Sequence, residues 1–531
     1  MSPALVKPRD ALPPARVDAR ALDAALDEWR TVLGPQWVLS GAAPGLARYH
    51  DDFALDDARA RAPRAALQPA NLKQVQKVLE IARRRGVPLW PLATGRNLGY
   101  GGAAARQAGM VMLDLSRMQR VLEINETLGY ALVEPGVSHL DLQRELARRG
   151  SALTAAPPAA GWGSVLGNLL ERGHGHTPRA EQFDNLCGLQ LLLADGTVVE
   201  TGLGARERGK PRALLPWRHG LPAASLFGQA NFAVVTRLGI ALAPRPAALR
   251  AYRVSVAAED DLRALVERLR PLLLEGVVAP GGAIVSLLLD AALVTTRRRL
   301  GGTTGPLDAA ARARLAADLG LGAWNYHGAF TGSEDSVAGD AKVLAEALRG
   351  LTGARFEFED VAGSSPGVAL HAALARGVAS TEAHAMIDWV GAGAHLDLDT
   401  SLPLRGDAAL AAFRAHQALS EEHGFDYLAS FQLGARDLRH RHMLVFARDD
   451  GHAGARAAKL YRALAAAAAR RGDGVLRTHL DFMDDIAAQY TWNDQAWLRT
   501  CESLKDALDP TGLLAPGKSG LWPGRGGRKG D

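Results

Sequence analysis

The residues with the clearest chemical potential form a glycine-rich loop at positions 94–102, which reads Thr-Gly-Arg-Asn-Leu-Gly-Tyr-Gly-Gly. Four glycines in nine residues let backbone N–H groups converge on a ligand, and such a nest of amides binds anions, usually phosphate. Arg96 can add positive charge, and Asn97 can fix the loop. No helix opens after the loop, so it is not a dinucleotide fingerprint, and no Gly-Lys-Ser/Thr follows, so it is not a P-loop. On these residues alone, a flexible surface turn is an equally good interpretation.

Two further loops of small residues lie far away in the sequence. Gly-Trp-Gly-Ser-Val-Leu-Gly-Asn spans 161–168, and Ala-Pro-Gly-Lys-Ser-Gly spans 515–520. Small side chains allow the backbone to approach a flat ligand closely. Three widely spaced loops of this kind predict one extended ligand with two phosphates and planar rings, and FAD fits that description.

The elements that must position these loops alternate between helices and short strands in the first half of the chain. A helix is predicted over 71–86, because Asn71 can cap it, Gln74 stands at the capping-box position and Gly86 can end it. Further elements are predicted as follows: helices over 20–34, 138–149, 259–274, 307–318, 336–350, 407–423, 453–471 and 495–508; strands over 87–92, 110–115, 121–125, 130–134, 232–243 and 443–447; and a hairpin over 189–200. The mixture predicts an α+β fold. The pattern changes near 243–250, so we expect one unit over 1–244, a second over 245–475 and a C-terminal segment over 476–531, with 524–531 disordered.

Composition excludes several classes of protein. The 531 residues are too many for one core. The net charge of +5 is mild and its arginines are scattered, which argues against nucleic acid as a partner. The two cysteines fit neither a disulfide scaffold nor a metal site. No apolar run has the length of a membrane span or a signal peptide, so we expect no membrane contact and a cytoplasmic location, although export with a partner stays open.

Several segments, in order from about residue 60 to 523, resemble the vanillyl-alcohol oxidase/p-cresol methylhydroxylase family of FAD-linked oxidoreductases. They are residues 88–105, 133–136, 164–173, 387–389, 393–395, 477–480 and 509–520. The resemblance implies a two-domain FAD-binding fold, in which 1–244 and 476–531 bind the flavin and 245–475 form an α+β cap over its ring. It also implies a covalent bond from His395, in Gly-Ala-His, to the 8α-methyl group of the flavin.

The loops and the resemblance together assign a set of residues to FAD. The set is Thr94, Gly95, Arg96, Asn97, Leu98, Gly99, Gly101, Gly102, Gly163, Ser164, Gly167, Asn168, Arg172, Val234, His395 and Lys518. We expect valine at Gly99 or Gly101 to abolish binding, because its side chain would fill the space that the pyrophosphate needs.

The family's site for para-phenols is matched only in part. Tyr100 and Arg477 match a tyrosine and an arginine that bind the phenolate. Other positions differ: Leu476 stands in place of a second tyrosine, Ala159 in place of an acid near flavin N5, His176 in place of a tyrosine, and Phe53, with His50 close by, in place of a histidine that assists attachment. These losses weaken phenolate binding and proton handling, unless other groups have taken over.

The titrating side chains available for that purpose are His174, His176 and His440. The pair His174-Gly-His176 is weak evidence for a metal, and none is predicted. Our catalytic candidates are Tyr100, Arg477, His176 and His440.

Three hypotheses for function follow. The first is an FAD-dependent oxidoreductase that takes hydride from a benzylic, allylic or alcohol C–H bond of a small aromatic or polar substrate and passes electrons to oxygen. The second is a dehydrogenase that passes electrons to a cytochrome subunit or another redox protein. The third is a flavin-binding protein that has lost turnover. Related enzymes often form homo-oligomers, and the altered walls predict slow turnover of simple 4-alkylphenols and faster turnover of larger aromatic or polar alcohols.

Overall fold

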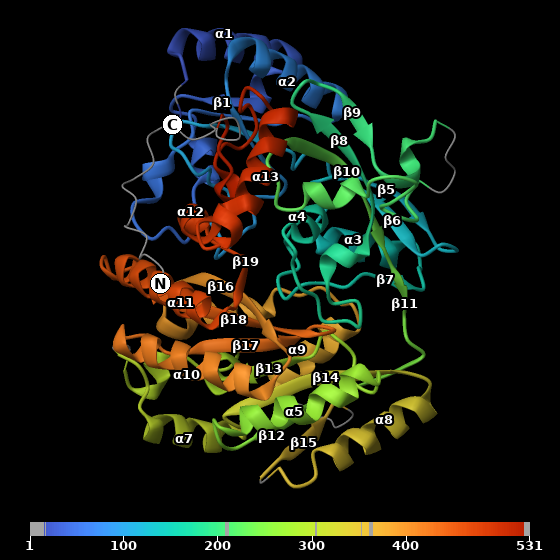
Figure 1. Cartoon of the computed structure of the whole chain (residues 1–531), viewed down its shortest axis with the longest axis vertical. Coiled ribbons are helices and arrows are strands. Elements are labelled where there is room, and N and C mark those ends of the chain that lie inside the picture. The colour runs from blue at the N-terminus through green and yellow to red at the C-terminus, as the bar shows by residue number, and fades with distance from the viewer. Residues whose placement is uncertain are drawn as a thin grey trace.

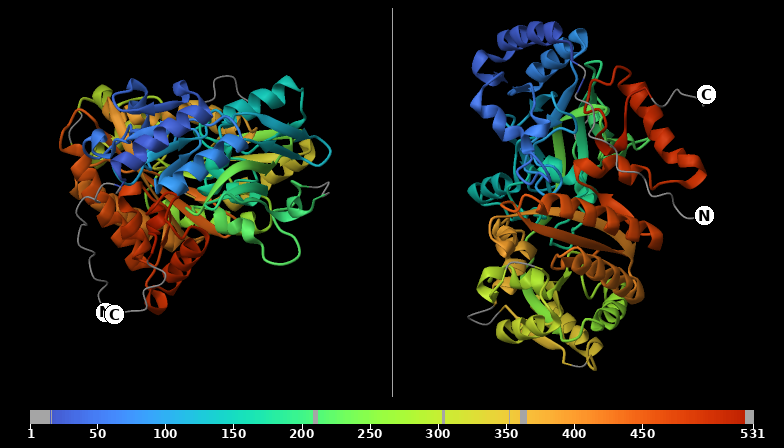
Figure 2. Two further views of the ribbon diagram at one scale, coloured as in Figure 1. Left: turned by 90° about the horizontal axis from the view of Figure 1, so that it is seen from above. Right: turned by 90° about the vertical axis from the view of Figure 1, so that its left-hand side faces the viewer.

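A computed structural model describes residues 15, 17–207, 212–302, 305–351, 353–359 and 365–524. Two parts are stacked along the long axis of the molecule (Figure 1). The upper part contains segments from both ends of the chain, and the lower part is built around one large sheet. The right-hand view of Figure 2 shows the C-terminal helices (red) beside the N-terminal elements (blue and green), above the large sheet and its helices. The expected α+β fold is confirmed.

The upper part contains two main sheets and a short strand pair. The parallel strands β2, β4 and β3, with β1 antiparallel at the edge, form a sheet of order β1-β2-β4-β3. An antiparallel sheet has the order β5-β6-β10-β8-β9, and β7 pairs with β11. The strands are β1 Val38–Ser40, β2 Ala65–Leu67, β3 Leu89–Leu92, β4 Val111–Asp114, β5 Val121–Asn125, β6 Tyr130–Val133, β7 Leu153–Thr154, β8 Leu186–Leu193, β9 Val198–Glu200, β10 Ala233–Ala241 and β11 Ala243–Pro244.

The helices of the upper part follow the capping signals of the sequence. They are α1 Ala19–Leu33, α2 Leu72–Arg85, α3 His139–Arg148, α4 Val165–Leu170, α12 Met483–Ala487 and α13 Trp492–Leu508. At the start of α2, the Asn71 side chain accepts from the Gln74 N–H, while the Gln74 side chain accepts from the Ala70 N–H. Gly86 ends this helix in the left-handed conformation, at φ +65°. In α13, residues 493–495 have positive φ, so the right-handed helix begins after Gln495.

The C-terminal segment is joined to the N-terminal part by a buried polar anchor. Lys505 is fully buried, and its ammonium group donates to the Asp509 carboxylate at 2.5 Å and to the carbonyls of Asn231 and Leu514 at 2.5 and 2.7 Å. The Asp509 carboxylate accepts in turn from the N–H groups of Leu513 and Leu514. These bonds place residues 513–515 beside Leu89 of β3, with which they exchange backbone hydrogen bonds. This pairing supports the prediction that residues 476–531 complete the flavin-binding unit, and the predicted boundaries at 244/245 and 475/476 stay predictions.

The lower part is an eight-stranded antiparallel sheet of order β15-β12-β14-β13-β17-β18-β16-β19. Its strands are β12 Ala248–Val256, β13 Ala283–Ser286, β14 Trp324–Gly332, β15 Arg355–Phe358, β16 Gly393–Pro403, β17 Leu428–Leu433, β18 Asp437–Ala447 and β19 Gly474–Arg477. Its helices are α5 Asp261–Leu274, α6 Leu287–Ala291, α7 Ala309–Leu319, α8 Glu334–Ala347, α9 Pro366–Ala375, α10 Gly406–Glu422 and α11 Ala453–Arg471.

The two faces of this sheet contact different parts of the molecule. One face packs on α5, α8 and α10 in an apolar core that includes Ile284 of β13 and Phe431 of β17. Because side chains alternate along a strand, their neighbours Val285 and Gln432 point to the opposite face, where both line a cavity. The sheet therefore forms one wall of that cavity.

Some remaining expectations concern the chain as a whole. Both cysteines are free, as predicted. No helix within the described ranges is long and apolar enough to cross a membrane. The disorder predicted for 524–531 lies, apart from Gly524, outside the described residues.

Candidate functional site

A cavity of about 390 Å³ lies between the three glycine-containing loops and the sheet of the lower part. The predicted cofactor residues that line it are Thr94, Gly95, Arg96, Asn97, Leu98, Gly101, Gly102, Gly163, Ser164, Gly167, Asn168, Val234, His395 and Lys518. Three loops, of which the first and the last are more than 400 residues apart in the sequence, thus meet at one cavity, as the extended-ligand interpretation requires.

Two members of the predicted cofactor set lie outside the lining. Arg172 has its guanidinium over the Phe183 ring, and its carbonyl accepts from Arg439 at 2.9 Å. Gly99 instead packs under a side chain, because a Cβ built there would lie 2.6 Å from His395 Cε1. A Cβ on Gly101 would lie 1.9 Å from Leu480 Cδ2. The space that valine would fill at Gly99 or Gly101 therefore belongs to protein side chains, which corrects the reason that we gave for these substitutions.

The first glycine loop needs backbone that only glycine adopts easily. It follows β3 directly, and Gly95, Gly99, Gly101 and Gly102 all have positive φ, from +57° to +111°. At the second loop, the Ser164 hydroxyl accepts from the Gly167 N–H at 3.1 Å and donates to the Pro135 carbonyl at 2.6 Å. These two bonds hold the second loop against Pro135, which follows β6.

His395 and Asp397 form a buried pair on β16. His395 Nδ1 lies 2.7 Å from Asp397 Oδ1, and each side chain is 3% exposed. Burial raises the pKa of Asp397, but His395 and Arg441 outweigh it and hold the pKa at about 2. A carboxylate on Nδ1 selects the tautomer whose Nε2 carries a free lone pair, and Nε2 has no partner among the described residues. The ring of Phe53 lies beside His395, with centroids 5.0 Å apart, whereas His50 does not line the cavity.

Tyr100 belongs to a second charged group in the cavity wall. Its hydroxyl donates to Asp399 Oδ2 at 2.6 Å and accepts from Arg441 Nη2 at 3.1 Å. The Arg477 guanidinium lies 3.9 Å from the centre of the Tyr100 ring and hydrogen-bonds the Asn97 side chain. Burial, together with Asp399 and Asp397, raises the pKa of Tyr100 well above its usual value, against the opposing effect of the two arginines. Tyr100 is therefore a neutral phenol whose proton is already committed to Asp399.

Sequence reasoning missed Arg441, Asp397 and Asp399. All three line the cavity, and Arg441 forms ion pairs with both carboxylates, at 3.4 and 3.3 Å. The missed signal is an alternation: His395, Asp397 and Asp399 occupy every second position of β16, between buried leucines. The register of β16 and β18 places Asp399 opposite Arg441.

The prediction that His440 faces the substrate is wrong, for the same geometric reason. On β18, Arg439, Arg441 and Met443 line the cavity, so His440 points to the other face of the sheet. There it stacks on Phe431, with ring centroids 4.3 Å apart, and its Nε2 lies 2.9 Å from the Tyr427 hydroxyl. It has a core role.

His174 and His176 do line the cavity, together with Ala159. Burial, with the nearby arginines, lowers the pKa of both histidines, that of His176 to about 4, so both are neutral at pH 7. Leu476 does not line the cavity, although Arg477 next to it does. A further group, Asp290 and His371, also lies in the wall and had no signal in the sequence.

The comparisons with known proteins agree with this geometry. Residues 63–202 match the FAD binding domain, and residues 330–519 match the C-terminal domain of FAD linked oxidases. The chain is 29% identical over 515 residues to the flavoprotein subunit of 4-cresol dehydrogenase (hydroxylating) from Pseudomonas putida, covering 96% of this chain and 98% of that protein. The solved structure of 4-ethylphenol oxidase from Gulosibacter chungangensis superposes with a TM-score of 0.93 at 33% identity, covering 97% and 100% of the two chains. A 1'-carboxy-chondrochloren decarboxylase from Chondromyces crocatus is 33% identical over 342 residues, or 62% of this chain and 61% of that protein.

The lining residues fit FAD. One cavity is lined by glycine backbone, by the cations Arg96 and Lys518, and by Asn168 and His395. Asn168 Nδ2 and His395 Nε2 are buried and have no partner among the described residues. The fold and the cavity define an FAD-dependent oxidoreductase of the oxidase or dehydrogenase type. Within that class, the chain belongs to the vanillyl-alcohol oxidase/p-cresol methylhydroxylase family.

Proposed function

We propose that the substrate is a phenol or aromatic alcohol that carries a further polar group, and that hydride leaves its benzylic or alcohol carbon. The observation that supports this most directly is the polar wall on the sheet side. Ser430, Gln432, Arg439 and Arg441 line it from β17 and β18. The names of two relatives, 4-cresol dehydrogenase and 4-ethylphenol oxidase, refer to phenols with only an alkyl substituent. Buried polar groups favour a substrate that can pair with them.

Arg477 is the group that we assign to the phenol or hydroxyl oxygen. Its Nε atom is buried and has no partner among the described residues, and it lies over Tyr100 in the cavity wall. Tyr100 supports it only indirectly, because its own proton is held by Asp399. A fixed cation in a site that excludes water stabilises an oxygen that gains negative charge. FAD, when bound, supplies the hydride acceptor at N5.

Steady-state turnover of matched substrates tests the proposal. We expect kcat/KM for aromatic alcohols with a polar ring or chain substituent to exceed that for 4-ethylphenol by at least about tenfold, because an unpaired buried polar group is costly. Equal or faster turnover of 4-ethylphenol would contradict the proposed substrate class. A flavin that dithionite bleaches, but that no phenol or alcohol bleaches, would instead favour the hypothesis of lost turnover.

We also propose that FAD is covalently bound through His395 Nε2. The support is the buried Asp397 carboxylate on Nδ1 and the free lone pair that it leaves on Nε2. After acid precipitation, the wild-type flavin should stay with the protein pellet, and His395→Ala should release it. His384→Ala is the matched control, since that ring also lines the cavity, 5.9 Å from the His395 ring. Release of all flavin from wild type would contradict the bond.

The electron acceptor, assembly and location complete the proposal. The acceptor is oxygen or a redox protein: one relative is an oxidase, and another is a flavoprotein subunit of a dehydrogenase. Hydrogen peroxide formed in proportion to substrate would identify oxygen as the electron acceptor. Reduction of a cytochrome without peroxide would identify a redox protein as the acceptor. We also propose that the chain forms a homo-oligomer, which light scattering would test, and that it is cytoplasmic, which cell fractionation would test.

A further inference from the structure

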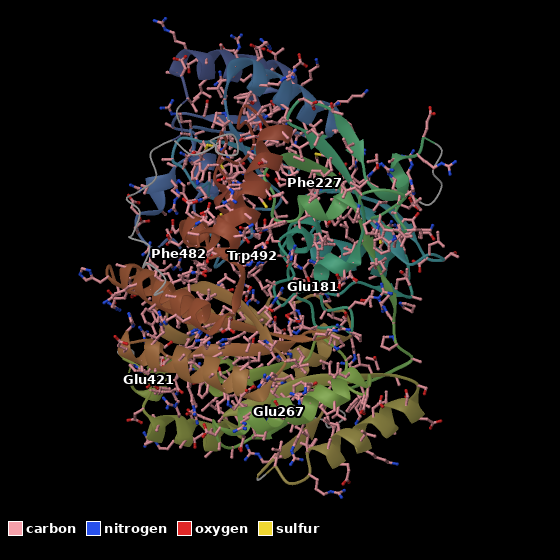
Figure 3. The ribbon with its side chains drawn as sticks, in the orientation of Figure 1. Glu181, Phe227, Glu267, Glu421, Phe482 and Trp492 are labelled. Atoms are coloured by element: carbon pink, nitrogen blue, oxygen red, sulfur yellow. The ribbon has the colours of Figure 1, made fainter. Side chains whose placement is uncertain are left out.

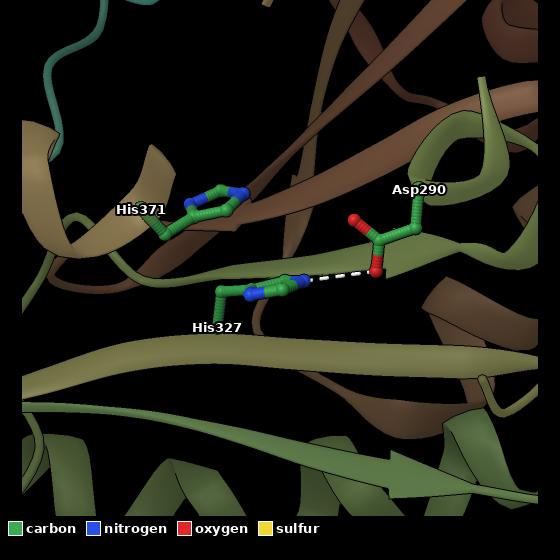
Figure 4. A group of neighbouring side chains, drawn as sticks. All are labelled: Asp290, His327 and His371. Carbon is green, nitrogen blue, oxygen red and sulfur yellow. Dashed lines mark hydrogen bonds and ion pairs between the residues drawn. The ribbon is translucent and has the colours of Figure 1, made fainter. Parts of the chain in front are cut away.

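Asp290, His327 and His371 form a polar cluster in the lower part, and neither the FAD assignment nor the phenol assignment above gives these three residues a role (Figure 4). They come from α6, β14 and α9. Asp290 is 5% exposed, and its Oδ2 lies 2.9 Å from His327 Nε2. The second carboxylate oxygen, Oδ1, and His327 Nδ1 are buried and have no partner among the described residues. Asp290 thus has one oxygen oriented by a histidine and one oxygen free to accept a proton.

The same three residues bring potential metal-ligand atoms within 4.8 Å of one another, but their orientation favours proton chemistry. The rings of His327 and His371 are stacked, with centroids 4.1 Å apart and planes 14° apart. The lone pairs of an imidazole lie in its ring plane, so those of two stacked rings run side by side and do not converge on one ion. His327 Nε2 is also already engaged by Asp290.

The cluster lies between two hollows. Asp290, His371 and His176 line the flavin cavity. His176 and His371 also line a second pocket of about 20 Å³, together with His327. That volume is sufficient for about one water molecule. The ring centroids of His176 and His371 are 5.5 Å apart. The imidazoles of His176, His371 and His327 therefore form a row between the flavin cavity and a pocket that can hold a water molecule.

Other carboxylates in the cavity wall are engaged by cations. Asp397 and Asp399 are ion-paired with Arg441, and Glu171 is ion-paired with Lys518 at 2.6 Å. Among the described residues, the ionic partner of Asp290 is a histidine alone, His327. The neighbouring rings of His176 and His371 are neutral, because burial lowers the pKa of both. Arg441 and His327 lower the pKa of His176 further, and His327 and His176 do the same for His371. Neutral imidazoles can accept and pass on a proton.

We propose that Asp290 is the proton acceptor of the reaction, and that His327 positions its carboxylate. This inference rests on the proposed function, in which an alcohol or phenol is oxidised. The substrate C–H bond breaks and its hydride, with both electrons, goes to the flavin. The O–H bond breaks, its proton goes to Asp290 Oδ1, and a C=O bond forms. The substrate loses two electrons, which bound FAD would accept with the hydride, and the proton leaves through the histidine row. Asp290 then takes the place of the acid that the family resemblance expects at Ala159.

The test is anaerobic stopped-flow reduction of the FAD-loaded enzyme by an aromatic alcohol that reduces wild type. We expect Asp290→Asn to slow flavin reduction by about 100-fold or more, which is typical for loss of a general base, while the flavin spectrum and its retention stay unchanged. In Asp290→Ala, added formate should restore the rate in proportion to its concentration. His327→Gln should slow reduction by about tenfold without rescue by formate, because the carboxylate is still present.

Asp426→Asn is the matched control. Asp426 is another buried carboxylate of the lower part, bonded to Trp389 and Arg297 and outside the flavin cavity, and its substitution should leave the reduction rate within about twofold. Wild-type rates in both Asp290 variants would overturn this inference alone. A wild type that no aromatic alcohol reduces would overturn it together with the proposed function. If purified wild type contains a stoichiometric transition metal that His371→Ala loses, the proton-acceptor inference is overturned in favour of a metal site. If the Asp290 variants do not fold, a wild-type reduction rate in His327→Gln overturns the inference.

Discussion

Alanine at Gly101 tests whether the flavin loop is shaped by the protein itself. Gly101 has φ +111°, and an added Cβ would lie 1.9 Å from Leu480 Cδ2 and 2.6 Å from its Cγ. Leu480 is 3% exposed and lines the cavity, so its side chain must shift to admit the added methyl group. The positive φ costs a non-glycine residue about 1–3 kcal/mol, and overpacking costs about 1–3 kcal/mol more. We therefore expect Gly101→Ala to lower the free energy of unfolding by about 2–6 kcal/mol.

The assay is guanidinium unfolding of the flavin-free protein, with Gly86→Ala as the control. Gly86 also has positive φ, at +65°, but a Cβ there meets nothing within 4 Å, so it should cost only about 1 kcal/mol. Adding Leu480→Ala to Gly101→Ala should remove the collision, and the double variant should be more stable than the sum of the two single changes predicts. If Gly101→Ala unfolds like wild type and loses only FAD affinity, the pyrophosphate and not Leu480 requires the glycine.

Four further results are expected. Asp397→Asn should lower the fraction of FAD that survives acid precipitation, because the Nδ1 partner of His395 becomes a weaker acceptor; an unchanged fraction would show that the tautomer is set otherwise. Lys505→Met should lower the free energy of unfolding by about 3–5 kcal/mol, measured by chemical denaturation, because it leaves the Asp509 charge buried and unpaired. Burial lowers the pKa of His416 and His440 well below the usual 6.5 and that of His442 to about 3. Below pH 6.5 the unfolded chain therefore binds more protons than the folded chain, and the free energy of unfolding should fall as the pH drops from about 6.5 to 4. His442→Gln should make that pH dependence less steep. Arg477→Leu should raise KM for phenolic substrates. Arg439→Leu removes a cation from the same wall, and it should raise KM for phenols without a polar side chain by less than Arg477→Leu does.

The sequence predicted the parts of the site that depend on local chemistry. The glycine loops and the capped helix after Asn71 each carry their signal within a few residues, and the structure brings the loops to one cavity. His395 was expected only from the family resemblance, because a lone histidine in an apolar segment has no local signal for a cofactor. The site residues without a signal in the sequence are those whose role depends on which face of the large sheet they occupy. Arg441 and His440 are neighbours in the chain, yet one lines the cavity and the other lies in the core, and only the register of the sheet decides between them.

The Asp290–His327 pair could not be predicted for a second reason. Its members are 37 residues apart and come from a short helix and a long strand. No motif links them, and each alone has an ordinary structural interpretation. Their juxtaposition is a product of tertiary packing. In the same way, an aspartate that engages Tyr100 from 299 residues away is visible only in the fold.

The central claim, that this chain oxidises aromatic alcohols or phenols through bound FAD, is tested most directly by one anaerobic titration. Purified protein should be yellow, and addition of a polar aromatic alcohol should bleach its visible flavin band in a single stoichiometric step, with the matching carbonyl compound or other two-electron oxidation product formed in equal amount. A colourless protein that gains no flavin on reconstitution, or a bound flavin that dithionite reduces but no phenol or aromatic alcohol does, would contradict the account.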